Sequence, residues 1–351
     1  MLFKLFLVVI SLSVANGDPP LFGSVNPLTI RSEKYVKTSG LNYRLPNNTK
    51  PLHYSLELET NVHKGEFDFY GSVAIKVKVL EATQSITLHS SRSIIYDIQL
   101  LSVNSTVISM NADYREQRDV EFLIISLPTV LAVDDIIIVL ITYAGILRDD
   151  EKGFYHSSYL NEEKKSVFLA TTQFESVYAR HAFPCYDEPG HRTTFDLLIK
   201  HDKSYTAISN TRSSGRIDVK GTDYVITKFE TTPSMQTYLL AFIISDFTFV
   251  QNSDEVLRHR VFAKRQSIGA GEGLIALDFG EKVMRQMEEH FGVKYSLPKM
   301  DQVAIPDFAA SAMENWGLVT YREESLLFNA KTTTESRDNI LTTIAHEFTV
   351  S

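Results

Sequence analysis

Two residues near the end of the chain, His346 and Glu347, are of the types that hold a metal ion and move a proton. In the helical pattern His-Glu-x-x-His, two imidazoles four residues apart bind zinc, and the Glu deprotonates the metal-bound water. Here Val350 stands four residues after His346, so the sequence contains only the first half of that pattern. A His-Glu pair also occurs on ordinary exposed helices, and the chemical interpretation therefore needs support from elsewhere in the chain.

That support comes from the loop at residues 306–323, which reads PDFAASAMENWGLVTYRE. It closely resembles the exopeptidase loop, usually written Gly-Ala-Met-Glu-Asn, of the zinc metallo-aminopeptidases similar to aminopeptidase N, the gluzincins. Three upstream segments look like that family's first-domain signatures in the same order: residues 153–155 (GFY), 170–175 (ATTQFE) and 183–189 (FPCYDEP). The resemblance covers nearly everything after Tyr43. It implies a zinc-dependent enzyme that releases N-terminal amino acids from peptides.

An aminopeptidase must recognise a free α-ammonium and exclude longer chains, which calls for carboxylates at the closed end of a cleft. The resemblance assigns this substrate-binding work to Glu314 and to the pair Gln173 and Glu175. Without the resemblance of the residues that flank it, Glu175 would be interpreted as a solvent-exposed carboxylate on a strand. The resemblance also implies that backbone groups of Ala312 and Met313 align the peptide as an added strand.

For the chemical step, the resemblance makes His346 a zinc ligand and Glu347 the general base. The second zinc-binding His and the Glu that is the third ligand do not appear before the sequence ends at Ser351. Since a catalytic zinc needs three protein ligands, we expect this chain to hold zinc poorly and to be inactive in peptide hydrolysis. The final Val350-Ser351 fits intron read-through, a genuine short isoform or an incomplete sequence.

A second departure from the family is Ser311, which replaces the usual first Gly of the loop. A Ser at this position would cost energy if the backbone needed a positive φ angle.

The strand is the dominant signal in the first two thirds of the chain. Apolar and polar residues alternate at residues 53–59 and 71–79, which predicts strands with one buried and one solvated face. Further β-branched and aromatic runs occupy residues 135–143, 166–171, 194–200, 224–231 and 237–249. Regular strands without intervening helices predict a mainly β saddle or antiparallel sandwich.

After about Asp254 the pattern changes to helices and short strands. Apolar residues recur at helical spacing across residues 274–291, between Gly273 and Gly292. Strands are expected near residues 302–305 and 318–321, and a last helix should begin with Ser336 as its N-cap. The resemblance makes this region the truncated start of an α/β thermolysin-like catalytic domain. We expect the apolar faces of both helices, including Ile340, Ile344 and Phe348, to lack partners within the chain.

Four segments follow from these patterns. We expect a signal peptide at residues 1–17, an N-terminal extension at 18–42, a β-rich aminopeptidase domain at 43–253 and an incomplete catalytic domain at 254–351. The 351 residues carry a net charge of −8 without long runs of one sign, which excludes nucleic acid as the expected partner. Cys185, the single cysteine, is best explained as a small buried hydrophobic residue.

The N-terminus indicates the compartment. Residues 1–17, MLFKLFLVVISLSVANG, combine one Lys, a short apolar run and small residues before a polar stretch, as in a secretory signal. The run is too short for a membrane anchor, and no later stretch reads as a membrane span. Sequons at Asn47 and Asn104 predict glycosylation. We therefore expect a protein that is secreted or lies on the extracellular face of the plasma membrane.

Two functions remain open at this point. The first is a zinc aminopeptidase acting on peptides with a free N-terminus. The second is a catalytically dead, secreted peptide-binding or decoy module that keeps the ammonium site. A plain β-sandwich adhesion domain would explain the strands but neither the loop at residues 306–323 nor His346 and Glu347.

Overall fold

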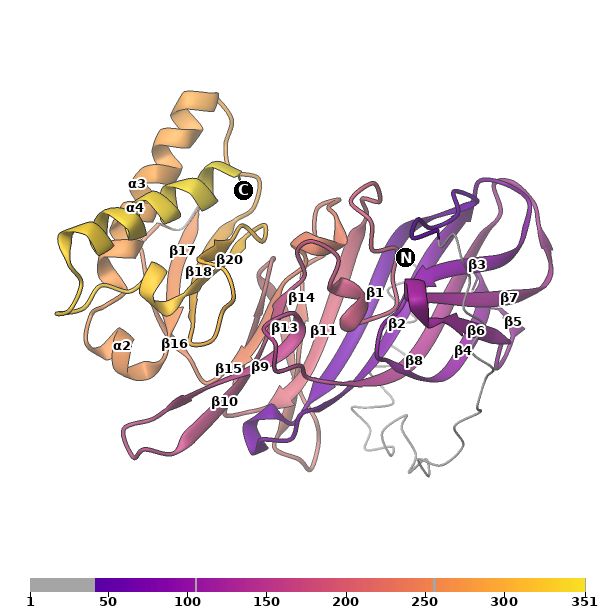
Figure 1. Cartoon of the computed structure of the whole chain (residues 1–351), viewed down its shortest axis with the longest axis horizontal. Coiled ribbons are helices and arrows are strands. Elements are labelled where there is room, and N and C mark those ends of the chain that lie inside the picture. Colours follow the sequence, from indigo (N-terminus) through magenta and orange to yellow (C-terminus); the bar gives the residue numbers. More distant parts are fainter. Residues whose placement is uncertain (1–41, 105, 255–256, 351) are drawn as a thin grey trace.

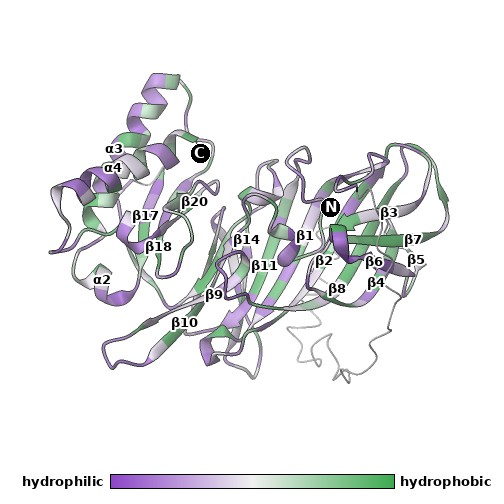
Figure 2. Cartoon of the chain, viewed as in Figure 1, coloured by the Kyte–Doolittle hydropathy of each residue, from purple (hydrophilic) through white to green (hydrophobic). Residues whose placement is uncertain are grey.

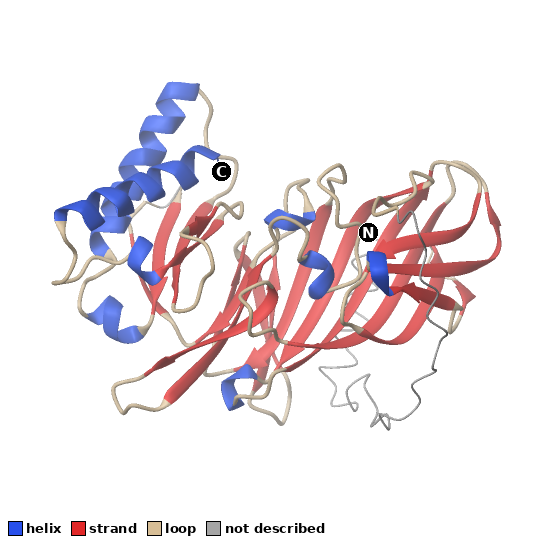
Figure 3. Cartoon of the chain, in the orientation of Figure 1, coloured by secondary structure: helices blue, strands red, loops and turns tan. Residues whose placement is uncertain are grey.

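The computed structural model describes residues 42–104, 106–254 and 257–350. The expected signal peptide at residues 1–17 and the expected extension up to residue 41 lie outside the described residues. Figure 1 shows a large β-rich part joined to a smaller part, in which two crossing helices lie over a sheet. Figure 3 shows the longer helices gathered in the smaller part, and strands dominating the larger one. The mainly β first domain followed by an α/β region is confirmed.

The largest sheet has the strand order β13-β14-β11-β1-β2-β8-β4-β5. The alternation expected at residues 53–59 is real, because Tyr54, Leu56 and Leu58 of β1 are buried in the core of the first part. β1 pairs antiparallel with β2 but parallel with β11, so the expectation of a purely antiparallel sheet is wrong at that pair. More than a hundred residues separate β1 from β11, which leaves room for the crossover that a parallel pair needs. The strands are β1 (Thr49–Thr60), β2 (Asp68–Val79), β4 (Ile94–Ser102), β5 (Val107–Ser109), β8 (Ile136–Ile146), β11 (Thr194–Asp202), β13 (Ser213–Asp218) and β14 (Tyr224–Phe229).

Two smaller sheets complete the first part, with the orders β3-β7-β6 and β12-β15-β10-β9. The long strand expected at residues 237–249 is wrong: the segment divides into a single 3-10 turn, η4, and the strands β15 and β16. Between the two strands, the Ser245 hydroxyl accepts the Phe247 N–H at 3.4 Å. The remaining elements of this part are β3 (Thr83–His89), β6 (Tyr114–Gln117), β7 (Phe122–Leu131), β9 (Gly153–Leu160), β10 (Ser166–Gln173), β12 (Thr206–Ser209), β15 (Phe242–Ser245), η1 (Val62–Lys64), η2 (Arg118–Val120), η3 (Ala179–His181) and η4 (Thr237–Leu239).

The second part is built on a sheet of order β16-β17-β18-β20-β19. β17, β18 and β20 run parallel, whereas the edge strands β16 and β19 pair antiparallel with their neighbours. β18 is buried along its whole length, as a strand covered on both faces must be. The elements are β16 (Thr248–Gln251), β17 (Arg258–Ala263), α2 (Arg265–Gly269), α3 (Leu274–Phe291), β18 (Lys299–Ile305), β19 (Ala312–Met313), β20 (Leu318–Arg322), η5 (Glu323–Ser325) and α4 (Thr334–Val350).

Both helices expected in this part are present. α3 lies between Gly273 and Gly292 as expected, and Gly292 ends it in the left-handed region at φ +65°. The expected N-cap of α4 is wrong by three residues, because Thr333 caps the helix by accepting the Ser336 N–H on its hydroxyl at 3.1 Å. Ser336 therefore occupies the third helical position, where its own N–H needs such a partner.

The apolar face of α4 does have partners within the chain. Ile340, Ile344 and Phe348 are buried in one cluster with Val283 and Met284 of α3, so the expectation of an uncovered face is wrong for α4. It holds for part of α3, where side chains at both ends of the helix are exposed: Leu274 by 54% and Phe291 by 59%.

The two parts share a hydrophobic core. Tyr155 and Leu169 of the first part pack in one buried cluster with Val303, Phe308 and Leu318 of the second. Figure 2 shows the apolar colour following the strands on both sides of this junction. Within the described residues, the search for helices long and apolar enough to cross a membrane finds none.

Candidate active site

The last two turns of α4 carry the candidate chemical groups. His346 is exposed, whereas Glu347 is buried next to Phe348 on the face that packs on the sheet. Burial first, and then the carboxylates of Glu314 and Glu175, raise the pKa of Glu347 to about 7. Three acidic residues that are far apart in the sequence therefore lie close enough to influence one another.

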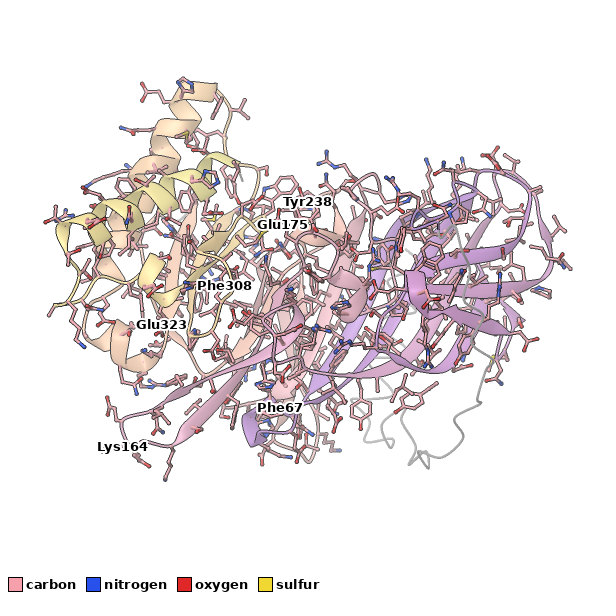
Figure 4. All side chains as sticks on the ribbon, viewed as in Figure 1. Phe67, Lys164, Glu175, Tyr238, Phe308 and Glu323 are labelled. Carbon is pink, nitrogen blue, oxygen red and sulfur yellow. The ribbon has the colours of Figure 1, made fainter. Side chains whose placement is uncertain are left out.

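Glu175 and Glu314 reach this site from different parts of the molecule. Glu175 follows the end of β10 in the first part, and Glu314 follows the edge strand β19 in the second. Figure 4 shows Glu175 at the upper end of the junction between the two parts, beside Tyr238. Loss of hydration and then the Glu314 carboxylate raise the pKa of Glu175, as two like charges sharing one site should. The Glu175–Ser176 peptide bond is cis.

Positive charge is scarce at these two carboxylates. Among the residues that the structure describes, no Lys, Arg or His forms an ion pair with Glu175 or Glu314. By contrast, Asp301 in the sheet of the second part forms an ion pair with Arg260. A cationic group placed between Glu175 and Glu314 would relieve their repulsion.

Gln173 is buried at the end of β10, opposite Gly153 of β9. Its Oε1 atom is buried and accepts no hydrogen bond in the structure. A buried amide oxygen without a donor is costly in a folded protein.

Part of the loop at residues 306–323 forms an edge strand, to which a peptide could bind as an added strand. Ala312 and Met313 pair with Tyr321 and Thr320 of β20 on one side, and β19 is the last strand of the sheet on the other. Ser311 does not take up a positive φ angle, so its replacement of Gly causes no backbone strain there.

Two tyrosines also belong to the site, although the sequence analysis did not single them out. Burial, followed by the carboxylates of Glu314 and Glu175, raises the pKa of Tyr238. Tyr321 is fully buried, with Glu347 raising its pKa after burial, and its hydroxyl has no hydrogen-bond partner among the described residues. Tyr321 lies inside the motif at residues 306–323 and could have been found there, whereas Tyr238 sits in an apolar run that gives no chemical signal.

Comparison with known proteins decides the family. The Peptidase M1 N-terminal domain matches residues 50–239, and the Peptidase family M1 domain matches residues 275–350. The chain belongs to the peptidase M1 family. Relatives include human aminopeptidase N, 36% identical over 95% of this chain and 36% of its own length. Aminopeptidase Ey of Gallus gallus is 36% identical over 87% of this chain and 32% of its own, and the Caenorhabditis elegans puromycin-sensitive aminopeptidase is 34% identical over 87% and 32%.

This M1 chain therefore spans about a third of the length of the curated relatives that it matches. The Peptidase family M1 match includes the segment with Glu314 and the start of the metal motif at His346. The resemblance seen in the motifs is confirmed over both domains.

The residues of this M1 chain that the structure describes do not complete a zinc site. A catalytic zinc is held by three protein ligands, and within the described ranges no group of three His, Cys, Asp or Glu side chains is arranged so that it could hold a metal ion. His346, the predicted zinc ligand, is exposed.

The structure also gives the exposure of the remaining singled-out residues. Asn47 and Asn104 are exposed, which a glycan acceptor requires, and Cys185 is fully buried in the core of the first part.

Proposed function

We propose that this chain carries the site with which a metallo-aminopeptidase of the M1 family recognises the free amino terminus of a peptide. The observation that supports it most directly is the pair of carboxylates, Glu175 and Glu314, which influence each other electrostatically and have no ion-pair partner among the described residues. An α-ammonium carries one positive charge and three donors, so it can bind both carboxylates at once. An N-acylated or internal peptide unit offers neither.

The surroundings of the pair favour a peptide rather than a simple cation. The peptide backbone would continue from the ammonium along Ala312 and Met313, whose outer edge pairs with no further strand of the described chain. The buried Oε1 of Gln173 would accept one more N–H from the substrate. Tyr238 would form a wall beside the ammonium.

Glu347 is the candidate general base of this proposal. It follows His346 on α4, and the carboxylates of Glu314 and Glu175 help to raise its pKa, which supports a site shared by the three acidic groups. Zinc would be the metal of a complete M1 site, with His346 as one ligand. The residues that the structure describes do not supply the three ligands that such a zinc needs.

The alternative, a secreted peptide-binding or decoy module without hydrolysis, uses the same carboxylates and differs only in whether the bound peptide is cleaved. The absence of a three-ligand set within the described residues is compatible with it. Zinc stoichiometry together with turnover of an aminoacyl chromogenic substrate by the purified chain separates the two. For either function we propose an extracellular location, with glycans on Asn47 and Asn104.

The binding proposal is tested with two peptides of one sequence, one with a free and one with an acetylated amino terminus. Isothermal titration of the purified chain should show tighter binding of the free form. Glu314→Gln and Glu175→Gln should each weaken that form about tenfold or more and leave the acetylated form unchanged, because a charge-assisted hydrogen bond contributes roughly 1.5–3 kcal/mol.

The matched control is Glu324→Gln, which removes an equally charged but exposed carboxylate ten residues along the chain from Glu314. Equal affinity of the wild-type chain for the two peptides would overturn the proposal. So would a loss in Glu324→Gln as large as that in Glu314→Gln.

A further inference from the structure

A buried cation lies directly beneath the loop that carries Glu314. Lys299, the first residue of β18, is 1% exposed, which is rare for a lysine. Its ammonium donates to the backbone oxygen of Gly317 at 2.6 Å and to that of Ser209 at 2.5 Å. Ser209 ends β12 in the first part, and Gly317 follows Glu314 by three residues in the second. One side chain therefore joins the two parts at the base of the proposed ammonium site.

Lys299 forms an ion pair within the same strand. Asp301 lies 2.8 Å from the Lys299 ammonium and is itself held by two hydrogen bonds from Arg260, each 2.7 Å long. Burial lowers the pKa of Lys299 to about 8, with Asp301 opposing this. The ammonium is thus retained near neutral pH, and all three of its donors point at fixed oxygen atoms.

Asn210 makes a second link, from the residue after Ser209. Its amide nitrogen donates to the Trp316 oxygen at 3.0 Å and to the Leu239 oxygen at 2.7 Å, and its amide oxygen accepts the Ala241 N–H at 2.9 Å. The carbonyls of Trp316 and Gly317 are therefore both bound by side chains from beneath the loop. Leu239 directly follows Tyr238, so the same amide also ties the loop to the tyrosine beside the carboxylates.

Gly317 permits this close approach. It has a φ of +83°, and a Cβ atom there would lie 2.3 Å from the backbone oxygen of Asn210. The loop and the first part are thus in backbone contact at this point, and a shift of either would break both side-chain links.

We propose that Lys299 and Asn210 are positioning residues, which hold the Trp316 and Gly317 carbonyls against the first part and so set the distance from Glu314 to Glu175. We call the hydrogen bonds of these two side chains to the loop the clamp. The effect of the clamp on substrate binding rests on the proposed function, whereas the clamp itself does not. Neither side chain contacts the ammonium-binding carboxylates in the structure, so their effect passes through the loop backbone. The clamp matters because the two carboxylates come from different parts of the molecule and must share one ammonium.

The test combines hydrogen exchange with peptide binding on the full chain. Lys299→Met keeps the length of the side chain but removes its charge, and Asn210→Ser is a milder variant should the first fail to fold. Both should speed amide exchange of Asp301 and Leu318, whose N–H groups donate to the Gly317 and Asn315 oxygens, by tenfold or more. Both should also weaken binding of the free-amino peptide at least fivefold while leaving the acetylated peptide unchanged.

The control is Met284→Ala, which opens a cavity in the core where α3 packs against α4 and alters neither Lys299 nor Asn210. This variant shows how general destabilisation alone changes amide exchange and peptide binding. Unchanged exchange at Asp301 and Leu318 in both variants overturns the clamp. Faster exchange with undiminished preference for the free-amino peptide overturns the positioning of Glu314. If the wild-type chain itself shows no such preference, the proposed function fails, and the exchange measurement still decides whether the clamp holds the loop.

Discussion

The hydroxyl of Tyr155 donates a hydrogen bond to the backbone oxygen of Asp307 at 2.9 Å, and so connects two motifs that lie 152 residues apart. Tyr155 belongs to β9 in the first part, and Asp307 follows β18 in the second. The Asp307 carboxylate strengthens the same contact by accepting a hydrogen bond from the Ser157 hydroxyl at 2.8 Å. The segments 153–155 and 306–323, which looked like separate signatures in the sequence, are thus two sides of one interface.

Tyr155→Phe tests how much this contact contributes. We expect the free energy of unfolding to fall by about 1 kcal/mol, the typical net value of one hydrogen bond. Amides near Asp307 should exchange faster, because the loop loses an anchor. Tyr159→Phe is the control, since it removes a hydroxyl from the same strand whose bonds go to Asp246 within the first part. Equal exchange near Asp307 in the two variants would contradict this role of Tyr155.

Gly317 should be far less tolerant of a side chain than Gly292. Both have a positive φ, of +83° and +65°, but only at Gly317 would a Cβ meet backbone, whereas Gly292 has nothing within 4 Å. Gly292→Ala should cost about 1–2 kcal/mol, the price of the left-handed conformation alone. Gly317→Ala should cost clearly more, because it also forces Asn210 away. Urea unfolding of the two variants measures the difference, and equal midpoints would refute it.

His259 should make the second part sensitive to acid. Burial lowers the pKa of His259 to about 4, with Asp301 opposing this, while the unfolded value is about 6.5. Its Nε2 lies 2.9 Å from the Gln302 amide nitrogen, which also donates to the Ala276 oxygen, so the ring must accept and stay neutral.

The sign of this dependence follows from proton binding. The unfolded chain takes up a proton below pH 6.5 and the folded chain does not, so stability is present above pH 6.5 and is lost as the pH falls towards 4. Between pH 7.5 and 5.0 we expect a loss of about 2 kcal/mol from this group. In urea unfolding, the free energy of unfolding of His259→Gln should fall by about 2 kcal/mol less than that of the wild type over the same pH interval. His290→Gln, which removes an exposed imidazole from α3, should behave like the wild type.

The exposed end and the buried middle of α3 should respond differently to substitution. Phe291 is 59% exposed, so Phe291→Ser should change the free energy of unfolding by no more than about 0.5 kcal/mol and should reduce light scattering at high protein concentration. Met284 is 4% exposed within the core, so Met284→Ala should cost about 2–5 kcal/mol. A large loss in Phe291→Ser would show that this side chain is covered in solution.

Local features of this fold could be read from the residues alone. The alternation in β1 and β2 and the glycines around α3 predicted the right elements, because side-chain period and backbone freedom act within a few residues. The motif at residues 306–323 indicated the peptidase M1 family before any contact was known. It also named Glu314 as a candidate, since a carboxylate among small residues in that order is distinctive.

The spatial relations were decided only by the tertiary structure. Parallel pairing of β1 with β11, the burial of Ile340, Ile344 and Phe348 beneath α3, and the approach of Glu175 to Glu314 all join segments whose separation no local pattern encodes. Lys299 shows the reason most clearly. In the sequence it is a lysine between Pro298 and Met300 that reads as a solvated charge. It can be buried because the folded chain brings Asp301 and the oxygen atoms of Ser209 and Gly317 around it, and partners contributed by distant segments exist only once the whole chain has folded.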